Sequence, residues 1–364
     1  MRLTRLAAEG FRNLAPFELD TDARFIVFHG ENAQGKTNAL EALWLLATLR
    51  PLRGHRLSDL VGWDADEAAI RGRVDRRGIS HLHEVELGPR GRSTRLDGDR
   101  VELVDYFRAI RAIAFQPSDE EIVSDSPAHR RRWLDRAAFT ARPAHLELVR
   151  VHRRVLQQKQ AALREGAKDD VLDVLDHQLA LAGARVAERR DEMLAELEPH
   201  ARELYERISD HRGELGLIYR TVASGGDLEQ RSSVLTKRLR ESRAGERRRR
   251  TTLTGVQRDD VVITIDGHPT RTFGSRGQVR SVVLALKLAE LRAARERGDT
   301  PLFLIDDVSS ELDRSRTSRL VTLLAELGTQ VFASTTSPEH LGDLPEDDTL
   351  FVSVRDGQLS PGKN

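Results

Sequence analysis

The stretch Gly30–Thr37, which reads GENAQGKT, decides how the chain can fold. It matches G-x-x-x-x-G-K-[ST] at every fixed position, with the apolar run Phe25–Phe28 before it and a helical pattern to about Leu49 after it. Glycines in such a loop let successive backbone N–H groups face a phosphate, and the start of the helix adds positive potential. Lys36 would supply a mobile positive charge, and the Thr37 hydroxyl a ligand for magnesium. The stretch therefore predicts a phosphate-binding loop rather than a plain glycine turn.

A second motif lies near the other end of the chain. Pro301–Asp307 reads PLFLIDD, which is typical of a buried strand that ends in two carboxylates. Beside a phosphate-binding loop, Asp306 would bind magnesium and Asp307 would position or deprotonate a water molecule. Alone, the pattern also fits a strand end with two solvated acids. Its pairing with Gly30–Thr37 favours a nucleotide site.

The separation of the two motifs predicts an insertion. Asp306 follows Lys36 by 270 positions, which is more chain than a compact phosphate-loop domain needs. We therefore expect the nucleotide-binding head to be split. Residues 1–115 would form its N-terminal part, residues 116–250 a mainly helical lobe, and residues 251–364 its C-terminal part.

The segments between the motifs differ in periodicity. Residues 70–96 alternate in the manner of a small antiparallel sheet, and residues 126–210 have the apolar spacing of long helices. Residues 224–226 and 240–250 are expected to be loops, because glycine or dense charge interrupts the pattern there.

Composition limits the class of protein. Of 364 residues, 39% are hydrophobic and 32% are charged, which allows a sizeable core and excludes a disordered or collagen-like chain. The absence of cysteine excludes disulfides, a thiol nucleophile and a Cys-ligated zinc. No apolar run approaches the ~20 residues of a membrane-spanning helix, and the first residues lack the pattern of a signal peptide. A cytoplasmic location is expected.

Positive charge is concentrated in one segment, although the chain has 58 basic and 58 acidic residues and no net charge. Arg130–Arg164 holds nine arginines and one lysine against two acidic residues. Such a concentration suits the phosphate backbone of a nucleic acid. It equally suits a solvated helix face balanced by acids elsewhere, and charge alone does not separate the two. The candidates for DNA contact are Arg130, Arg131, Arg132, Arg153 and Arg154.

Four shorter motifs occur in the order and spacing of an ATP-binding-cassette ATPase. They are Gln116 after an apolar run, Ser275–Gln278 before a helical pattern, Ser309–Asp313 after the acidic strand, and Thr335 at the end of the next strand. With these motifs the chain resembles the bacterial RecF family, which is related to the SMC-type ATPases. The resembling stretches span nearly the whole chain: Gly10–Leu14, Asn38–Ala42, Arg130–Asp135, Arg258–Asp260, Phe273–Arg280, Leu286–Glu290 and Asp306–Asp313.

The resemblance implies an α/β fold, namely an ABC-type (SMC/RecF-like) P-loop ATPase head with an inserted helical lobe. It implies that ATP and Mg²⁺ are the cofactors, with Thr37, Asp306 and Gln116 around the metal. Asp307 would be the general base, and Gln116 would contact the metal or the attacking water. ATP would be held by Gly30, Glu31, Asn32, Ala33, Gln34, Gly35, Lys36, Thr37, Asn38 and Arg12.

The resemblance also assigns residues to a second subunit's nucleotide. Ser275, Gly277 and Gln278 would form the signature motif, which contacts the γ-phosphate held by the opposite subunit. Thr335, or alternatively Thr336, would be the switch residue, where transporters have histidine. The chain departs from the family where Gly255–Gln257 replaces a frequent Gly-Pro-His, which leaves the role of the following residues open.

The function implied by the resemblance is recombinational repair at replication gaps. The protein would dimerise when it binds ATP and would hydrolyse ATP slowly. It would bind mainly the phosphate backbone of DNA, and it would help to load the strand-exchange protein together with RecO and RecR. A DNA clamp with incidental hydrolysis is an alternative. A small-substrate kinase or a transporter ATPase also fits the phosphate-binding loop, but the signature motif disfavours the first and the basic helical lobe the second.

Overall fold

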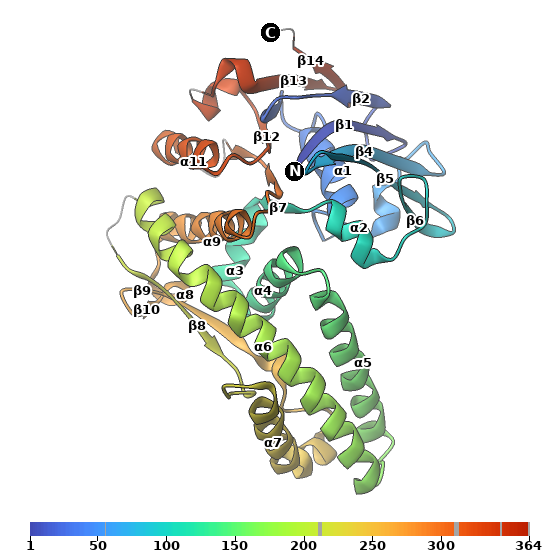
Figure 1. Ribbon diagram of the computed structural model, residues 1–364, viewed down its shortest axis with the longest axis vertical. Coiled ribbons are helices and arrows are strands. Elements are labelled where there is room, and N and C mark those ends of the chain that lie inside the picture. The colour runs from blue at the N-terminus through green and yellow to red at the C-terminus, as the bar shows by residue number, and fades with distance from the viewer. Residues whose placement is uncertain (55, 210–212, 309–312, 343, 363–364) are drawn as a thin grey trace. The chain divides into compact units, whose positions relative to one another are not determined.

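The computed structural model describes residues 1–54, 56–209, 213–308, 313–342 and 344–362 (Figure 1). Contacts between residues divide the chain into two compact units. Unit 1 comprises Met1–Asp119, Arg207–Asp210 and Leu284–Asn364, and unit 2 comprises Glu120–Glu206 and His211–Val283. None of the described helices is both long and apolar enough to cross a membrane.

Unit 1 is built on a six-stranded sheet with the order β14-β13-β3-β12-β11-β7. Five neighbouring strands are parallel, and only the edge strand β14 runs antiparallel to its neighbour. The inner strands are apolar and buried because both faces of a parallel sheet are covered. The bounds are β3 Phe25–His29, β7 Ala112–Phe115, β11 Leu302–Ile305, β12 Val331–Thr335, β13 Thr349–Arg355 and β14 Gln358–Pro361.

The register of this sheet brings the predicted motifs to one edge. Ile305 of β11 pairs with Phe115 of β7 on one side and with Ala333 of β12 on the other. Thr335 of β12 pairs with His29 of β3. The residues that follow these positions leave the sheet at its carboxyl edge, where open α/β sheets bind ligands.

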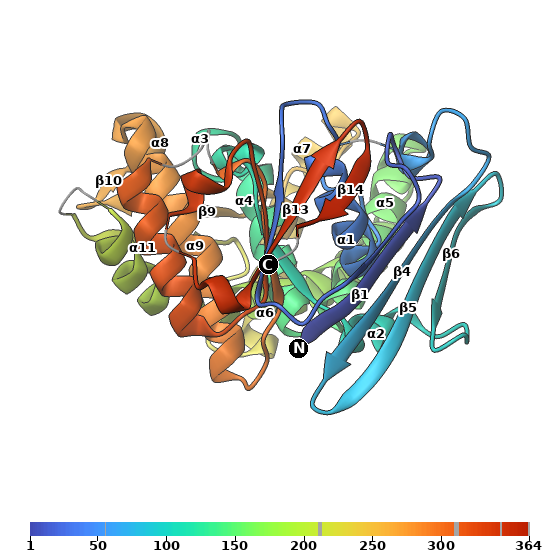
Figure 2. The same cartoon turned by 90° about the horizontal axis from the view of Figure 1, so that it is seen from above.

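A five-stranded antiparallel sheet completes unit 1, in the order β2-β1-β4-β5-β6. It confirms the sheet expected at 70–96, and buried residues alternate with exposed ones along β1 and β4. Helix α1 (Lys36–Thr48) packs against strands of both sheets (Figure 2), and most of its residues are buried. The strands are β1 Arg2–Glu9, β2 Phe17–Asp20, β4 Ala68–Arg76, β5 Ile79–Gly88 and β6 Gly91–Leu96. The remaining helices are η1 Leu57–Leu60, α2 Leu103–Ala109, α11 Arg314–Leu327, η4 Pro338–Leu341 and η5 Glu346–Asp348.

Unit 2 is mainly helical. Its core forms where α5, α6 and α7 meet, with Val155, Leu179 and Leu235 among the buried side chains. A three-stranded antiparallel sheet, β10-β9-β8, joins this bundle. The elements are α3 Glu121–Ser124, α4 Pro127–Ala141, α5 His145–Arg164, α6 Asp169–Ile208, β8 Leu215–Arg220, α7 Leu228–Arg249, η3 Val256–Arg258, β9 Asp260–Ile265, β10 His268–Pro269 and α8 Thr270–Phe273. Three of the described helices cross a boundary between the units: η2 (Pro117–Glu120), α6, whose last two residues belong to unit 1, and α9 (Arg276–Glu296).

Two expectations differ from this fold. Residues 240–250 are not a loop, because α7 continues to Arg249 and Arg243 is held by carboxylates of α6. Residues 251–283, expected in the C-terminal part of the head, belong to unit 2. The reason is strand pairing: Val261–Ile265 of β9 pair with β8, so this segment completes the sheet of unit 2.

Candidate nucleotide-binding site

The loop between β3 and α1 has the backbone of a phosphate-binding loop. Gly30 and Gly35 have φ angles of 145° and 112°, and Ala33 also has a positive φ. A Cβ added to Gly30 would lie 2.4 Å from the Val354 carbonyl oxygen. Gly35 caps α1 without any side-chain hydrogen bond, so the helix begins with backbone N–H groups available to an anion.

Lys36 lies folded back across this loop. Its Nζ donates hydrogen bonds to the carbonyl oxygens of Gly30 at 2.8 Å and Glu31 at 2.6 Å. Burial lowers the pKa of Lys36, and the nearby charges of Asp307 and Asp306 oppose this shift. The ammonium group thus lies where a phosphate on the loop would meet it.

The side chains of Gln34 in the loop and Asn38 in the first turn of α1 bind within the protein. Gln34 Oε1 accepts a hydrogen bond from the backbone N–H of Asp356 at 2.6 Å. Asn38 Nδ2 donates to Asn13 Oδ1 at 2.7 Å. These contacts fix the flanks of the loop.

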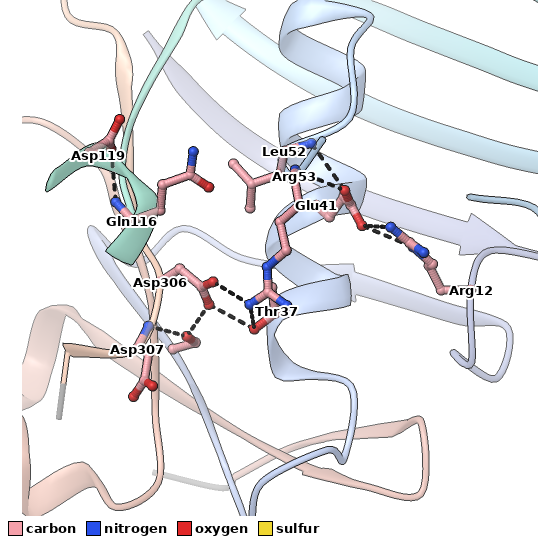
Figure 3. Close-up of polar contacts among 10 residues, drawn as sticks. Arg12, Thr37, Glu41, Leu52, Arg53, Gln116, Asp119, Asp306 and Asp307 are labelled. Carbon is pink, nitrogen blue, oxygen red and sulfur yellow. Dashed lines mark hydrogen bonds and ion pairs between the residues drawn. The ribbon is translucent and has the colours of Figure 1, made fainter. Parts of the chain in front are cut away.

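Thr37 and Asp306 meet as the sequence predicted (Figure 3), and Ser334 is bonded to Asp306 as well. Asp306 is 2% exposed, and its Oδ1 accepts from the Thr37 hydroxyl at 2.8 Å and the Ser334 hydroxyl at 2.9 Å. Asp307 has a positive φ of 55°, and its backbone N–H donates to Ser334 Oγ at 2.8 Å. Ser334 therefore orders both acidic residues. The only sequence signal for it was a polar residue at the end of an apolar parallel strand.

Arg53 lies in the candidate site, although sequence reasoning missed it. Its Nη2 donates to Asp306 Oδ2 at 2.9 Å and to Thr37 Oγ at 3.3 Å (Figure 3). A cation thus lies on two of the predicted magnesium ligands. Thr37 and Asp306 together thus accommodate a positively charged group. Carboxylate and hydroxyl oxygens are also the donors that magnesium prefers.

Glu41, on α1, was missed as well. It is 1% exposed, its Oε1 accepts from the Leu52 N–H at 3.0 Å, and its Oε2 accepts from Arg12 at 2.8 and 3.0 Å. Arg12, assigned to ATP, therefore points to Glu41 here. One buried carboxylate holds both Arg12 and the segment that carries Arg53.

Gln116 emerges next to Asp306, since β7 and β11 are neighbouring parallel strands. Its backbone N–H donates to Asp119 Oδ2 at 3.0 Å, and Asp119 pairs with Lys287 of α9 at 3.1 Å.

Thr335 is fully buried, and its hydroxyl donates to the Ser337 carbonyl oxygen at 2.9 Å. This hydroxyl is turned into its own loop, so the switch role of Thr335 stays a prediction.

The signature motif lies at the start of α9, in unit 2. The Ser275 N–H donates to Gln278 Oε1 at 2.8 Å, and the Gln278 N–H donates to Ser275 Oγ at 3.3 Å. This reciprocal cap leaves Ser275 exposed and Gly277 partly exposed. Of the motif Ser309–Asp313, residues 309–312 lie outside the described residues, and Asp313 caps α11.

The five arginines considered for DNA contact divide into two groups. Arg130 is buried, bonded to Asp260 at 2.6 and 3.1 Å and to the Asp125 carbonyl oxygen at 2.8 Å. Arg131 donates to the Asp259 carbonyl oxygen at 2.6 Å. Both arginines thus make contacts within unit 2, and their contact with DNA stays a prediction. The exposed members of the set are Arg132, Arg153 and Arg154.

Arg258–Asp260 follow Gly255–Gln257, the position where the chain departs from the family's Gly-Pro-His. Asp259 and Asp260 of this segment also make contacts within unit 2. Asp260 holds Arg130, and Asp259 accepts from the Tyr219 hydroxyl at 2.5 Å. Burial raises the pKa of Asp259 to about 6. This segment ties β8 and β9 to α4.

Comparison with known proteins shows the family of the chain. Residues 2–358 match the model of the RecF/RecN/SMC N terminal domain. A DNA replication and repair protein RecF from Geobacter metallireducens is 40% identical over 345 residues, which is 94% of each chain. The corresponding protein of Geobacter sulfurreducens is 39% identical over 365 residues, covering 99% of this chain and all of the relative.

Solved structures of a RecF protein and of an Smc head are similar to this chain as well. A structure of the recombination mediator protein RecF-ATP in the RecFOR pathway matches with a TM-score of 0.89 and 28% identity, over 99% of this chain and 97% of that one. An Smc head bound to the C-winged helix domain of ScpA matches with a TM-score of 0.58 and 15% identity, over 100% and 97% of the chains, and supports the fold alone. The predicted ABC-type head with a helical insertion is confirmed.

Proposed function

The chain belongs to the RecF family, and from this premise we propose that it is an ATP-dependent DNA-binding protein of replication-gap and recombinational repair. The observation that carries the proposal is the corner where Thr37, Asp306 and Ser334 meet beside the phosphate-binding loop. We further propose that it works with RecO and RecR partners to load the strand-exchange protein.

The chain's own residues divide the work on ATP. The backbone of Gly30–Gly35 and the start of α1 bind the phosphates, and Lys36 exchanges its two carbonyl acceptors for phosphate oxygens. Magnesium, held by Thr37 and Asp306 with Gln116 nearby, would neutralise charge on the phosphates. Asp307, fixed by its N–H bond to Ser334, orients and deprotonates the attacking water.

Hydrolysis would act as a switch between two subunits. Ser275, Gly277 and Gln278 would close on the γ-phosphate held by a second copy of the chain. ATP would therefore support a homodimer, and the dimer would support DNA binding. Loss of the γ-phosphate would reverse both.

The function is tested by binding to gapped and blunt duplex DNA, each with and without ATP and magnesium. We expect binding that requires ATP and is tighter on gapped DNA. Equal binding without nucleotide would contradict the switch. A non-hydrolysable analogue that gives the same DNA release rate as ATP would favour the clamp with incidental hydrolysis.

The exposed arginines of unit 2 give a prediction about DNA contact. Replacing Arg132, Arg153 and Arg154 by glutamine should weaken binding to all DNA sequences alike. The slope of log affinity against log salt should fall by roughly one for each lost phosphate contact. A salt titration measures the slope, and the matched control is glutamine at Arg90 and Arg100, which are exposed in unit 1. An unchanged slope would place the DNA surface elsewhere.

A further inference from the structure

A positively charged side chain of the protein, Arg53, already lies where Thr37 and Asp306 would bind magnesium. We propose that Arg53 occupies the magnesium position when nucleotide is absent and keeps divalent metal out until ATP arrives. The inference rests on the proposed nucleotide-binding function and adds a residue that controls when the metal enters.

The carboxylate of Asp306 requires a positive neighbour. It is 2% exposed, and a buried carboxylate without a countercharge is strongly destabilising. Its Oδ1 is bound to Thr37 and Ser334, and its Oδ2 is bound to Arg53 at 2.9 Å. The ammonium group of Lys36 is bonded to two loop carbonyl oxygens instead. Arg53 is the cation paired with Asp306 in the described site.

Arg53 also contacts the second predicted ligand of the metal. Its Nη2 lies 3.3 Å from Thr37 Oγ, so one nitrogen contacts an oxygen of each residue. In the proposed site a divalent metal would use these same oxygens of Asp306 and Thr37. Mg²⁺ binds its oxygen ligands at about 2.0–2.1 Å. A guanidinium and a metal ion therefore cannot occupy this corner together.

The backbone and the side chain of Arg53 are held differently. The neighbouring Leu52 N–H is bonded to the buried carboxylate of Glu41, which belongs to α1. The Arg53 side chain is 53% exposed. The arginine is thus anchored at its backbone while its guanidinium reaches the corner from the solvent side. Displacing the guanidinium requires no change in the fold of α1.

This arrangement couples metal to nucleotide. Metal alone must displace Arg53 and gains only the oxygens that the arginine gives up. Metal arriving with ATP brings phosphate oxygens that complete its coordination and offset the displaced positive charge. The nucleotide-free protein should accordingly bind divalent metal weakly.

Binding of Mn²⁺ to the full-length, nucleotide-free protein tests the proposal, with free Mn²⁺ measured by electron paramagnetic resonance. Arg53→Gln should tighten Mn²⁺ binding roughly tenfold, because a unit charge about 3 Å from the site is removed. Arg53→Lys, which keeps the charge, should remain close to wild type. Arg90→Gln, an exposed arginine of the same unit, is the matched control and should leave the affinity unchanged. Arg53→Met serves as a second neutral variant if Arg53→Gln folds poorly.

Two further measurements make the result specific. Asp306→Asn added to Arg53→Gln should abolish the gain, and Mn²⁺ should raise the unfolding temperature of Arg53→Gln more than that of wild type. Equal Mn²⁺ affinity in wild type and the neutral variants would overturn the proposal, as would an equal gain in Arg53→Lys or a gain that survives Asp306→Asn. These outcomes are separate from the proposed function, which wild-type ATP and DNA binding test directly.

Discussion

Asparagine in place of Asp307 is expected to leave ATP binding intact and to slow hydrolysis by about 100-fold or more, the usual contribution of a general base. Asp307 is the second residue after β11, and its φ of 55° is unusual for a residue other than glycine. Its N–H bond to Ser334 holds it there. Asparagine tolerates the same left-handed backbone, so the substitution removes the base and keeps the local geometry.

The measurement is single-turnover hydrolysis beside equilibrium ATP binding. Lys36→Ala provides the opposite pattern, since it should weaken ATP binding itself by removing the charge that meets the phosphates. Asp66→Asn, at an exposed carboxylate of unit 1, is the matched control and should change neither quantity. Hydrolysis by Asp307→Asn at the wild-type rate would show that another group is the base.

The sequence was sufficient for the parts of the site that depend on short-range order. A phosphate-binding loop needs its glycines, lysine and threonine at fixed spacing between a strand and a helix. Asp306 needs only to end a buried strand of the same sheet. Both requirements are local, and the parallel register of β3, β11 and β12 then brings Thr37 and Asp306 together.

The residues that were missed depend on tertiary contacts. Glu41 looks like any charged residue of a helix until the chain returns and places Leu52 and Arg12 against it. Arg53 lies in a segment without a regular pattern, and its partner Asp306 is 253 positions away. Periodicity and spacing carry no signal for such pairs.

A count of charges in the helical lobe could not separate structural arginines from exposed ones, for a related reason. Arg130 is bonded to Asp260, which follows it by 130 positions, so a local excess of arginine did not mean a free positive surface. Lys159 lies buried between Asp176 and Glu246, both at 2.6 Å. The dense run of charge around Arg243 predicts a loop, but carboxylates of α6 stabilise this segment as a helix. Only the three-dimensional partners distinguish a structural arginine from one available to DNA.

The signature motif makes the other large prediction, that ATP creates the dimer. Its donors lie at the exposed start of α9, and in the proposed arrangement they contact only a nucleotide held by a second subunit. Two nucleotides related by a two-fold axis would then each join two subunits. Linkage requires the converse: dimerisation must tighten ATP binding by the same factor by which ATP tightens the dimer.

Arginine in place of Ser275 should abolish dimerisation and hydrolysis, because a long charged side chain would fill the space that the γ-phosphate must enter. ATP binding to the monomer should persist, since the phosphate-binding loop lies in unit 1. Losing the cap to Gln278 costs about 1 kcal/mol of stability, and Ser275→Ala isolates that cost. Ser233→Arg, at an exposed serine of α7, is the matched control for added charge and bulk. Sedimentation with and without ATP and magnesium measures the outcome, and a wild-type protein that stays monomeric with saturating ATP and DNA would contradict the bridged dimer.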